Sequence, residues 1–196
     1  MKTNHVGSLS VFLILALICV FLSCSNDDDG SPTTPNNGTI DSTGGTTLWI
    51  DTIQALSGSQ VKVDVNVVTG FAMRGMTLPL SFSGISFYID SVSFVGTIFD
   101  GDPLVDTIRI DSTAKTVDIL KAYSTDHFIE PDSGVLASIY VTLFDLAPPQ
   151  TIEIDTITIE AENGSISRML FTDTTSVPYP RTIIPVFRPG VIEVSI

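Results

Sequence analysis

Cysteine is nearly absent from this chain. Cys19 and Cys24 are the only two, and both lie in or beside an apolar run at the N-terminus. The rest of the chain therefore cannot build a disulfide framework, a thiolate zinc site or a cysteine nucleophile. Its stability has to come from a hydrophobic core, and a hydrophobic share of 43% in 196 residues is ample for one.

Basic side chains are scarce as well. Nine Lys and Arg residues stand against 22 Asp and Glu residues, so the formal net charge is −13. An acidic surface repels nucleic acid phosphates and anionic lipid head groups, so we expect no nucleic-acid partner. Two explanations of the acidity stay open: a solvated surface that keeps the protein soluble, and a surface for cationic partners or calcium. No residue pattern supports a calcium site.

Catalytic signatures are missing too. The sequence has no phosphate loop, no dinucleotide fingerprint and no metal-binding pair of histidines. His127 is the only histidine outside the leader, and we expect it in an exposed loop. Asp100-Gly101-Asp102 lacks the ligand spacing of an EF-hand, which favours a turn with exposed acids. No pair of carboxylates stands out for glycoside hydrolysis, so we expect a protein that is not an enzyme and has no cofactor.

Residues 1–23 have the features of a lipoprotein signal peptide. Lys2 supplies a positive charge, and the apolar run over 11–22 is shorter than the roughly 20 residues of a membrane span. The run ends in Phe21-Leu22-Ser23-Cys24, which resembles a bacterial lipobox, although Phe21 is bulkier than the usual Leu. This resemblance implies cleavage before Cys24 and acylation of that cysteine, which would anchor the chain in a membrane. The alternative is ordinary secretion with Cys24 incidental.

Residues 24–46 are predicted to form a flexible tether. They are acidic and rich in Thr, Gly, Ser and Pro, and they have too few apolar side chains to offset the entropy of ordering. Asp27-Asp28-Asp29 is similar to the acidic signals that send some Bacteroidetes-type lipoproteins to the cell surface. A merely solvated linker explains the run equally well. We expect a lipid-anchored protein of the bacterial outer membrane or cell surface.

Alternation of apolar and polar residues predicts an all-β domain over 47–196. The strongest pattern covers residues 134–144, where side chains alternate between the two faces of a strand. One face is apolar throughout, so we predict a central strand with this face on the core. That face consists of Val135, Ala137, Ile139, Val141 and Leu143.

Irregularities in the other strands predict local features. Pro79 interrupts an alternating run over 76–82, and its missing N–H favours an edge position or a bulge. The pattern slips by one residue at Asp90-Ser91 and at Asp155-Thr156, which predicts a bulge or a strand that changes sheet. About nine short strands without helical periodicity predict an antiparallel β-sandwich with jelly-roll topology.

Five segments, in order, resemble a cohesin domain, the β-sandwich module of cellulosome scaffolds. The best match is Ser133-Gly134-Val135-Leu136-Ala137-Ser138-Ile139-Tyr140-Val141, which resembles the family's Asp-Gly-Val-Leu-Ala-Thr-(Ile/Leu)-x-(Phe/Val) strand. The others lie at 58–65, 74–82, 89–96 and 189–194. The resemblance covers 48–196 and implies a flat-sheet contact with a calcium-loaded dockerin protein. It also implies kinship with carbohydrate-binding modules.

Three functions are compatible with these observations. The first is a surface adaptor that binds a dockerin-like protein through one sheet, with Thr77, Arg109 and Asp118 as predicted contact residues because their apolar neighbours take the core side. The second is a carbohydrate-binding module that binds polysaccharide. It requires aromatic side chains on one exposed face, with Trp49, Tyr88, Tyr123 and Tyr140 as candidates. The third is a structural envelope lipoprotein without a discrete ligand.

Overall fold

The computed structural model of the chain describes residues 45–124, 128–130, 132–160, 164–173 and 181–196. All of them belong to the compact unit Gly38–Ile196. The predicted signal peptide, Cys24, the tether up to residue 44 and His127 lie outside the described residues. Among the residues that are described, no helix is long and apolar enough to cross a membrane.

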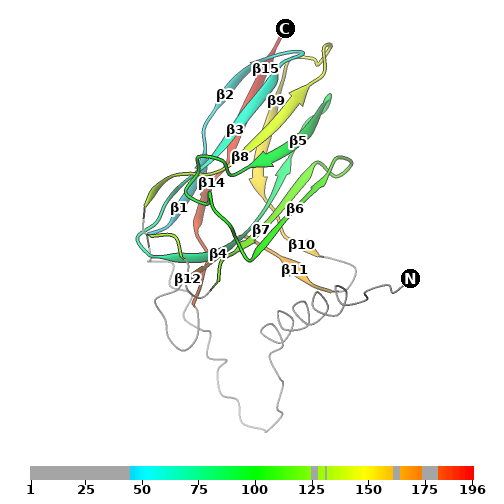
Figure 1. The fold of residues 1–196 in the computed structure, drawn as a ribbon. Helices are drawn as coiled ribbons and strands as arrows, with labels where there is room; N and C mark the ends of the chain where they lie inside the picture. The colour runs from blue at the N-terminus through cyan, green and yellow to red at the C-terminus, as the bar shows by residue number, and fades with distance from the viewer. Residues whose placement is uncertain (1–44, 125–127, 131, 161–163, 174–180) are drawn as a thin grey trace, which may run out of the picture. The chain divides into compact units, whose positions relative to one another are not determined.

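The described residues form strands that assemble into two main sheets (Figure 1). One sheet has the order β14-β1-β3-β8-β5, and the other has the order β13-β12-β4-β9-β15-β2, with β7 beside β4 and β6 beside β7. Among these strands, β10 and β11 pair only with each other, in a two-stranded hairpin. The strands are β1 Thr47–Ile50, β2 Ile53–Leu56, β3 Gln60–Val68, β4 Met73–Phe82, β5 Phe87–Ser93, β6 Val105–Asp111, β7 Thr116–Ala122, β8 Ser133–Leu143, β9 Gln150–Thr156, β10 Ile159–Glu160, β11 Ile166–Ser167, β12 Leu170–Asp173, β13 Thr182–Ile183, β14 Val186–Arg188 and β15 Gly190–Ser195.

The alternating side chains of both sheets meet in one hydrophobic core. In β8, Ala137, Ile139, Val141 and Leu143 are buried, and the strand lies between β3 and β5, so the predicted central strand is confirmed. Each fully buried aliphatic side chain of this kind stabilises the fold by about 1.5–3 kcal/mol. The all-β sandwich of jelly-roll type that the sequence predicts is therefore the fold of this chain.

One residue of the predicted core face of β8 is on the wrong side. Val135 lies opposite Asn66, which faces outward, whereas Leu136 is fully buried. The cause is a register shift between Val65 and Asn66 of β3, where β8 contributes an extra residue. A bulge of this kind reverses the phase of the side chains on either side of it.

The two predicted slips in register occur. The pairing of β5 with β8 shifts between Ile89 and Ser91, and the carboxylate of Asp90 then accepts hydrogen bonds from Gln60 (3.1 Å) and Thr142 (2.6 Å). The second slip follows β9, which ends at Thr156, and the chain continues into β10 of a different sheet. The first prediction is therefore met by a bulge and the second by a change of sheet.

Pro79 occupies an interior strand, so the predicted edge position is wrong for β4 as a whole. On one side Pro79 pairs with Asp118 of β7. On the other side β12 pairs with β4 only up to Thr77, and β9 begins to pair at Leu80, so Pro79 has no partner in the ladder there. The Pro79 carbonyl accepts the Ile157 N–H (3.3 Å) on that unpaired side. In an antiparallel strand the N–H and C=O of one residue point to the same side, so an N–H at position 79 would point there too. The missing donor therefore costs no ladder hydrogen bond.

The strand count and the pairing also differ from the prediction. The described residues contain fifteen strands rather than about nine, because the six strands β2 and β10 to β14 have only two to four residues each and are too short to show alternation. Two pairs, β1 with β14 and β2 with β15, are parallel, so the sandwich is not antiparallel throughout. The parallel pairs arise because residues 47–56 cross from one sheet to the other between β1 and β2.

The connection between β9 and β15 shapes both outer surfaces. These two strands are antiparallel neighbours, yet the chain between them contains the hairpin β10–β11, the pair β12–β13 and strand β14. β12 extends the sheet beside β4, whereas β14 joins the opposite sheet beside β1. This excursion therefore contributes residues to the outer faces of both sheets.

Candidate interaction surfaces

The outer face of β6, β7 and β4 is arranged in rows by the strand register. One row consists of Arg109, Asp118 and Pro79, and the row beside it consists of Thr107, Leu120, Thr77 and Leu170 of β12. Since side chains that are opposite in register share a face, these residues point to the same side of the sheet. The next row is Val105, Ala122, Gly75 and Thr172.

The structure brings the three predicted contact residues together on this face. Arg109 and Asp118 are direct cross-strand partners, and Thr77 lies in the adjacent row. Their neighbours Leu78, Val117 and Ile119 are buried in the core, as the alternation predicts. Ile108 is 37% exposed although it faces inward, because β6 is the edge strand of this sheet. The role of Thr77, Arg109 and Asp118 in a contact stays a prediction.

The hairpin β10–β11 covers one side of this face, which the sequence did not reveal. Ser167 of β11 donates a hydrogen bond to the Asp118 carboxylate (2.6 Å), and Pro79 is buried although it belongs to an outward row. Ile166 beside Ser167 is 62% exposed. The open part of the face therefore runs from β6 across β7 to the first half of β4 and β12.

The charges of this face lie at its margin. The two rows through Thr77 and Gly75 contain no charged residue, and Leu120 and Leu170 in them are half-buried. Arg109, Asp111 and Asp118 lie in the rows that follow the Thr77 row on the side away from Gly75. An uncharged centre with a charged rim is the composition of protein–protein contacts.

Beneath this face, a buried lysine holds the connection between β5 and β6. Lys121 is 2% exposed, and its ammonium donates a hydrogen bond to the Phe99 carbonyl (2.9 Å) and lies 3.7 Å from the centre of the Phe94 ring. Tyr123 donates its hydroxyl to the same carbonyl (2.8 Å). Burial lowers the pKa of Lys121, which the nearby carboxylates of Asp106 and Asp100 partly offset.

Tyr123 titrates in the opposite direction, because its charged form is an anion. Burial raises the pKa of its phenol, and the carboxylates of Asp106 and Asp100 raise it further. The Tyr123 phenol therefore keeps its proton at neutral pH and donates it to the Phe99 carbonyl. Two hydrogen bonds on one oxygen therefore tie the connection between β5 and β6 to Lys121 of β7 and to Tyr123 just after it.

Three of the four aromatic residues proposed for sugar stacking share one face, and the fourth does not. Tyr123 is in the core, so it is removed from the candidates. Trp49 of β1, Tyr140 of β8 and Tyr88 of β5 all belong to outward positions of the five-stranded sheet. Tyr88 packs against Phe144, with ring centres 5.9 Å apart, and Trp49 and Tyr140 are half-buried.

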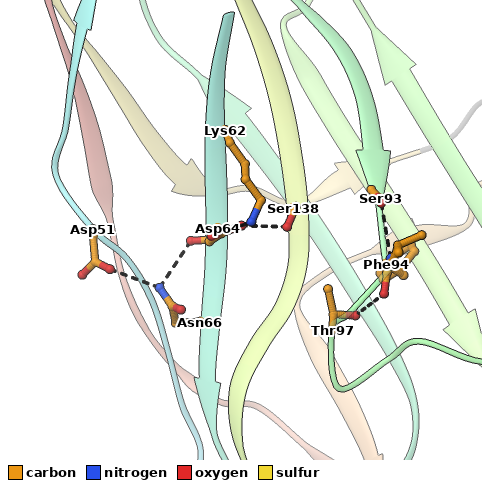
Figure 2. A network of polar contacts seen from close by, with 9 residues as sticks. Asp51, Lys62, Asp64, Asn66, Ser93, Phe94, Thr97 and Ser138 are labelled. Carbon is orange, nitrogen blue, oxygen red and sulfur yellow. Dashed lines mark hydrogen bonds and ion pairs between the residues drawn. The ribbon is translucent and has the colours of Figure 1, made fainter.

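Polar side chains on the outer face of the same sheet are linked to one another by hydrogen bonds and an ion pair (Figure 2). The Asp64 carboxylate binds Lys62 (2.9 Å) and accepts the Ser138 hydroxyl (2.7 Å). The Asn66 amide donates to the Asp51 carboxylate (3.3 Å), which links β3 to the residue that follows β1.

The remaining predicted site residues are in a turn. Asp100 and Asp102 are exposed in the connection from β5 to β6, and the Asp100 carboxylate accepts the Gly96 N–H (2.8 Å). Throughout the described part of the chain, no group of three or more His, Cys, Asp or Glu side chains is placed to hold a metal ion.

Comparison with known proteins gives a consistent result. No protein-family model and no curated protein matches this sequence. Solved structures do match. The seventh ScaB type I cohesin from Pseudobacteroides cellulosolvens is 15% identical with a TM-score of 0.61, over 76% of this chain and 92% of that chain. A type I cohesin–dockerin complex from Clostridium thermocellum, Coh-OlpA-Doc918, is 12% identical with a TM-score of 0.61, over 76% and 99%.

A non-cellulosomal cohesin from the archaeon Archaeoglobus fulgidus is also similar, with 12% identity and a TM-score of 0.53 over 77% of this chain and 91% of that chain. At such low identity the likeness concerns the fold alone. This chain has a divergent cohesin-like fold.

Proposed function

We propose that this chain is a non-catalytic surface lipoprotein whose cohesin-like domain binds a partner protein of the dockerin type. The contact surface is the outer face of β6, β7, β4 and β12. The observation that carries the proposal is the uncharged centre of this face, with Leu120 and Leu170 half-buried in it and Arg109 and Asp118 at its rim. Several solved structures of this fold are cohesin–dockerin complexes, which supports a partner of this type.

Capture by the immobilised chain tests the proposal. The chain from Ser25 onwards is exposed to the secreted proteins of its own organism, once with calcium and once with a chelator. We expect retention of a protein that carries a dockerin, and we expect the chelator to release it, because a dockerin of the kind implied by the resemblance is calcium-loaded. Calorimetry with that purified protein then gives the affinity.

Two variants with the same substitution locate the contact. Leu120→Arg places a charge in the centre of the face, and burying it unpaired should weaken binding by about tenfold or more. Leu146→Arg is the control, because Leu146 is 93% exposed in the connection between β8 and β9, away from this face. Equal affinities of the two variants, or a secretome that yields no dockerin-bearing protein, would contradict the proposal.

The anchor is tested separately. We propose that Cys24 is acylated and holds the chain at the outer membrane or cell surface, since several acyl chains at about 0.8 kcal/mol per buried methylene anchor a protein firmly. Cys24→Ala should release the mature protein from the membrane fraction and abolish labelling with palmitate. Cys19→Ala is the matched control and should change neither. A Cys24→Ala protein that stays in the membrane fraction contradicts this assignment.

A further inference from the structure

An open hollow of about 510 Å³ lies on the outer face of the five-stranded sheet, at the end formed by β1 and β14. It is lined by Thr47, Trp49, Ile50, Asp51, Val68 and Arg188. We propose that this hollow binds a neutral saccharide, with the Trp49 ring as the platform for a pyranose and Arg188 and Asp51 as its hydrogen-bonding groups.

Strand geometry explains why Trp49 faces the hollow. Leu48 and Ile50 on either side of it are buried in the core, so the side chain between them points outward. In the register, Trp49 lies opposite Asn66 of β3 and Arg188 of β14. It is half-buried, which means that its neighbours cover part of the indole and the rest borders the hollow. An indole that is apolar on its faces and polar at its N–H suits the C–H face and hydroxyls of a sugar.

The polar groups around Trp49 are placed to bind hydroxyls. Arg188 is exposed, and its guanidinium has no hydrogen bond or ion pair with any of the described residues. Asp51 accepts one hydrogen bond from the Asn66 amide (3.3 Å), which orients the carboxylate and leaves its other lone pairs open (Figure 2). The guanidinium can only donate and the carboxylate can only accept, so together they match a hydroxyl group, which does both.

Charge identifies the ligand as neutral. Arg188 and Asp51 balance each other within the hollow, whereas the whole chain carries a formal charge of −13. An anionic sugar such as a uronate gains nothing from the balanced pair and is repelled by the chain as a whole.

Val68 contributes an apolar side chain to the lining of the hollow. It is 42% exposed and lies opposite Thr47 in the register. An aromatic and apolar lining with a few placed polar groups is the composition of small-molecule sites. The hollow lies on the sheet opposite to the proposed protein contact, so the two sites do not depend on each other.

The composition of the chain supplies a direct reporter, because Trp49 is its only tryptophan. Fluorescence of the chain from Ser25 onwards is titrated with cellohexaose, xylohexaose, mannohexaose and laminarihexaose, and with hexagalacturonate as the anionic probe. We expect a saturable change in emission with at least one neutral hexaose and none with hexagalacturonate. No saturable change with any neutral probe, or a change with hexagalacturonate alone, overturns the proposal.

Variants separate the hollow from the rest of the sheet. With the neutral hexaose that binds, Arg188→Gln should weaken affinity by about tenfold, because it removes a charge-assisted donor. Tyr88→Ala is the control on the same sheet outside the hollow and should bind normally. Trp49→Ala, measured by calorimetry and checked for folding by circular dichroism, should not bind. A Trp49→Ala protein that is folded and binds normally would overturn the assignment, as would equal losses in Arg188→Gln and Tyr88→Ala.

Discussion

The Phe99 carbonyl accepts two buried hydrogen bonds, and this shared acceptor predicts a strong coupling between its donors. Lys121 and Tyr123 both bind it, at 2.9 and 2.8 Å. Removing one donor leaves the other in place. Removing both leaves a buried oxygen without either of the donors seen here, since Phe99 is fully buried. The double variant should therefore lose more stability than the two single variants together.

The magnitudes follow from the surroundings of each donor. Tyr123→Phe removes one neutral hydrogen bond and should cost about 1 kcal/mol. Lys121→Met keeps the buried stem and removes the ammonium with its contact to the Phe94 ring. The loss is offset because the cost of burying the charge disappears too, so we expect a change of about 1 kcal/mol or less. An unsatisfied buried carbonyl costs about 1–3 kcal/mol, so the double variant should exceed the sum by about 1–2 kcal/mol.

Urea unfolding at 25 °C measures all four proteins of this cycle. Trp49 lies in the other sheet, so its fluorescence reports global unfolding in each of them without being altered by the substitutions. Equal slopes against urea concentration establish that the four transitions are comparable. Additivity of the two single variants within about 0.5 kcal/mol would refute the shared acceptor as a source of stability.

Two further predictions concern pH and a close backbone contact. Burial holds the pKa of Lys121 below its ordinary 10.5, so between the two values this group binds more protons in the unfolded chain, and its contribution to stability rises with pH. The free energy of unfolding of the wild type, relative to that of Lys121→Met, should therefore increase as the pH rises towards 10.5. Tyr123 is present in both proteins, so the contribution of its titration cancels in this difference. The check is urea unfolding across this pH range, and a constant difference would contradict the assignment. Gly190→Ala places a Cβ 2.8 Å from the Ile50 carbonyl oxygen and should cost about 3 kcal/mol by thermal unfolding. Gly70→Ala, which meets nothing within 4 Å, is the control and should cost far less.

Much of the candidate contact face followed from alternation alone. Because β7 and β4 alternate regularly, the outward direction of Thr77 and Asp118 could be predicted from the burial of Val117, Leu78 and their neighbours. Alternation does not say which strands lie side by side. That Arg109 is opposite Asp118, with Thr77 in the next row, depends on the register of β6, β7 and β4.

The hairpin β10–β11 was beyond prediction for a different reason. Two-residue strands have no period to detect, and Ser167 reaches Asp118 across 49 positions of sequence. The bulge in β8 was missed similarly, because Val135 and Leu136 are both apolar and the sequence alone does not tell which of them the core takes.

The sequence by itself determined the class of fold and the inner face of most strands, because burial of one apolar face is a local property with a period of two. It also excluded disulfides and thiolate-bound metal from residues 25–196, since cysteine is absent there. Tertiary structure alone decided which sheet each strand joins, that Pro79 lacks a ladder partner on one side of β4, and that Trp49 shares a hollow with Arg188. These features join residues that are far apart in the chain, so they depend on long-range pairing that no local pattern encodes.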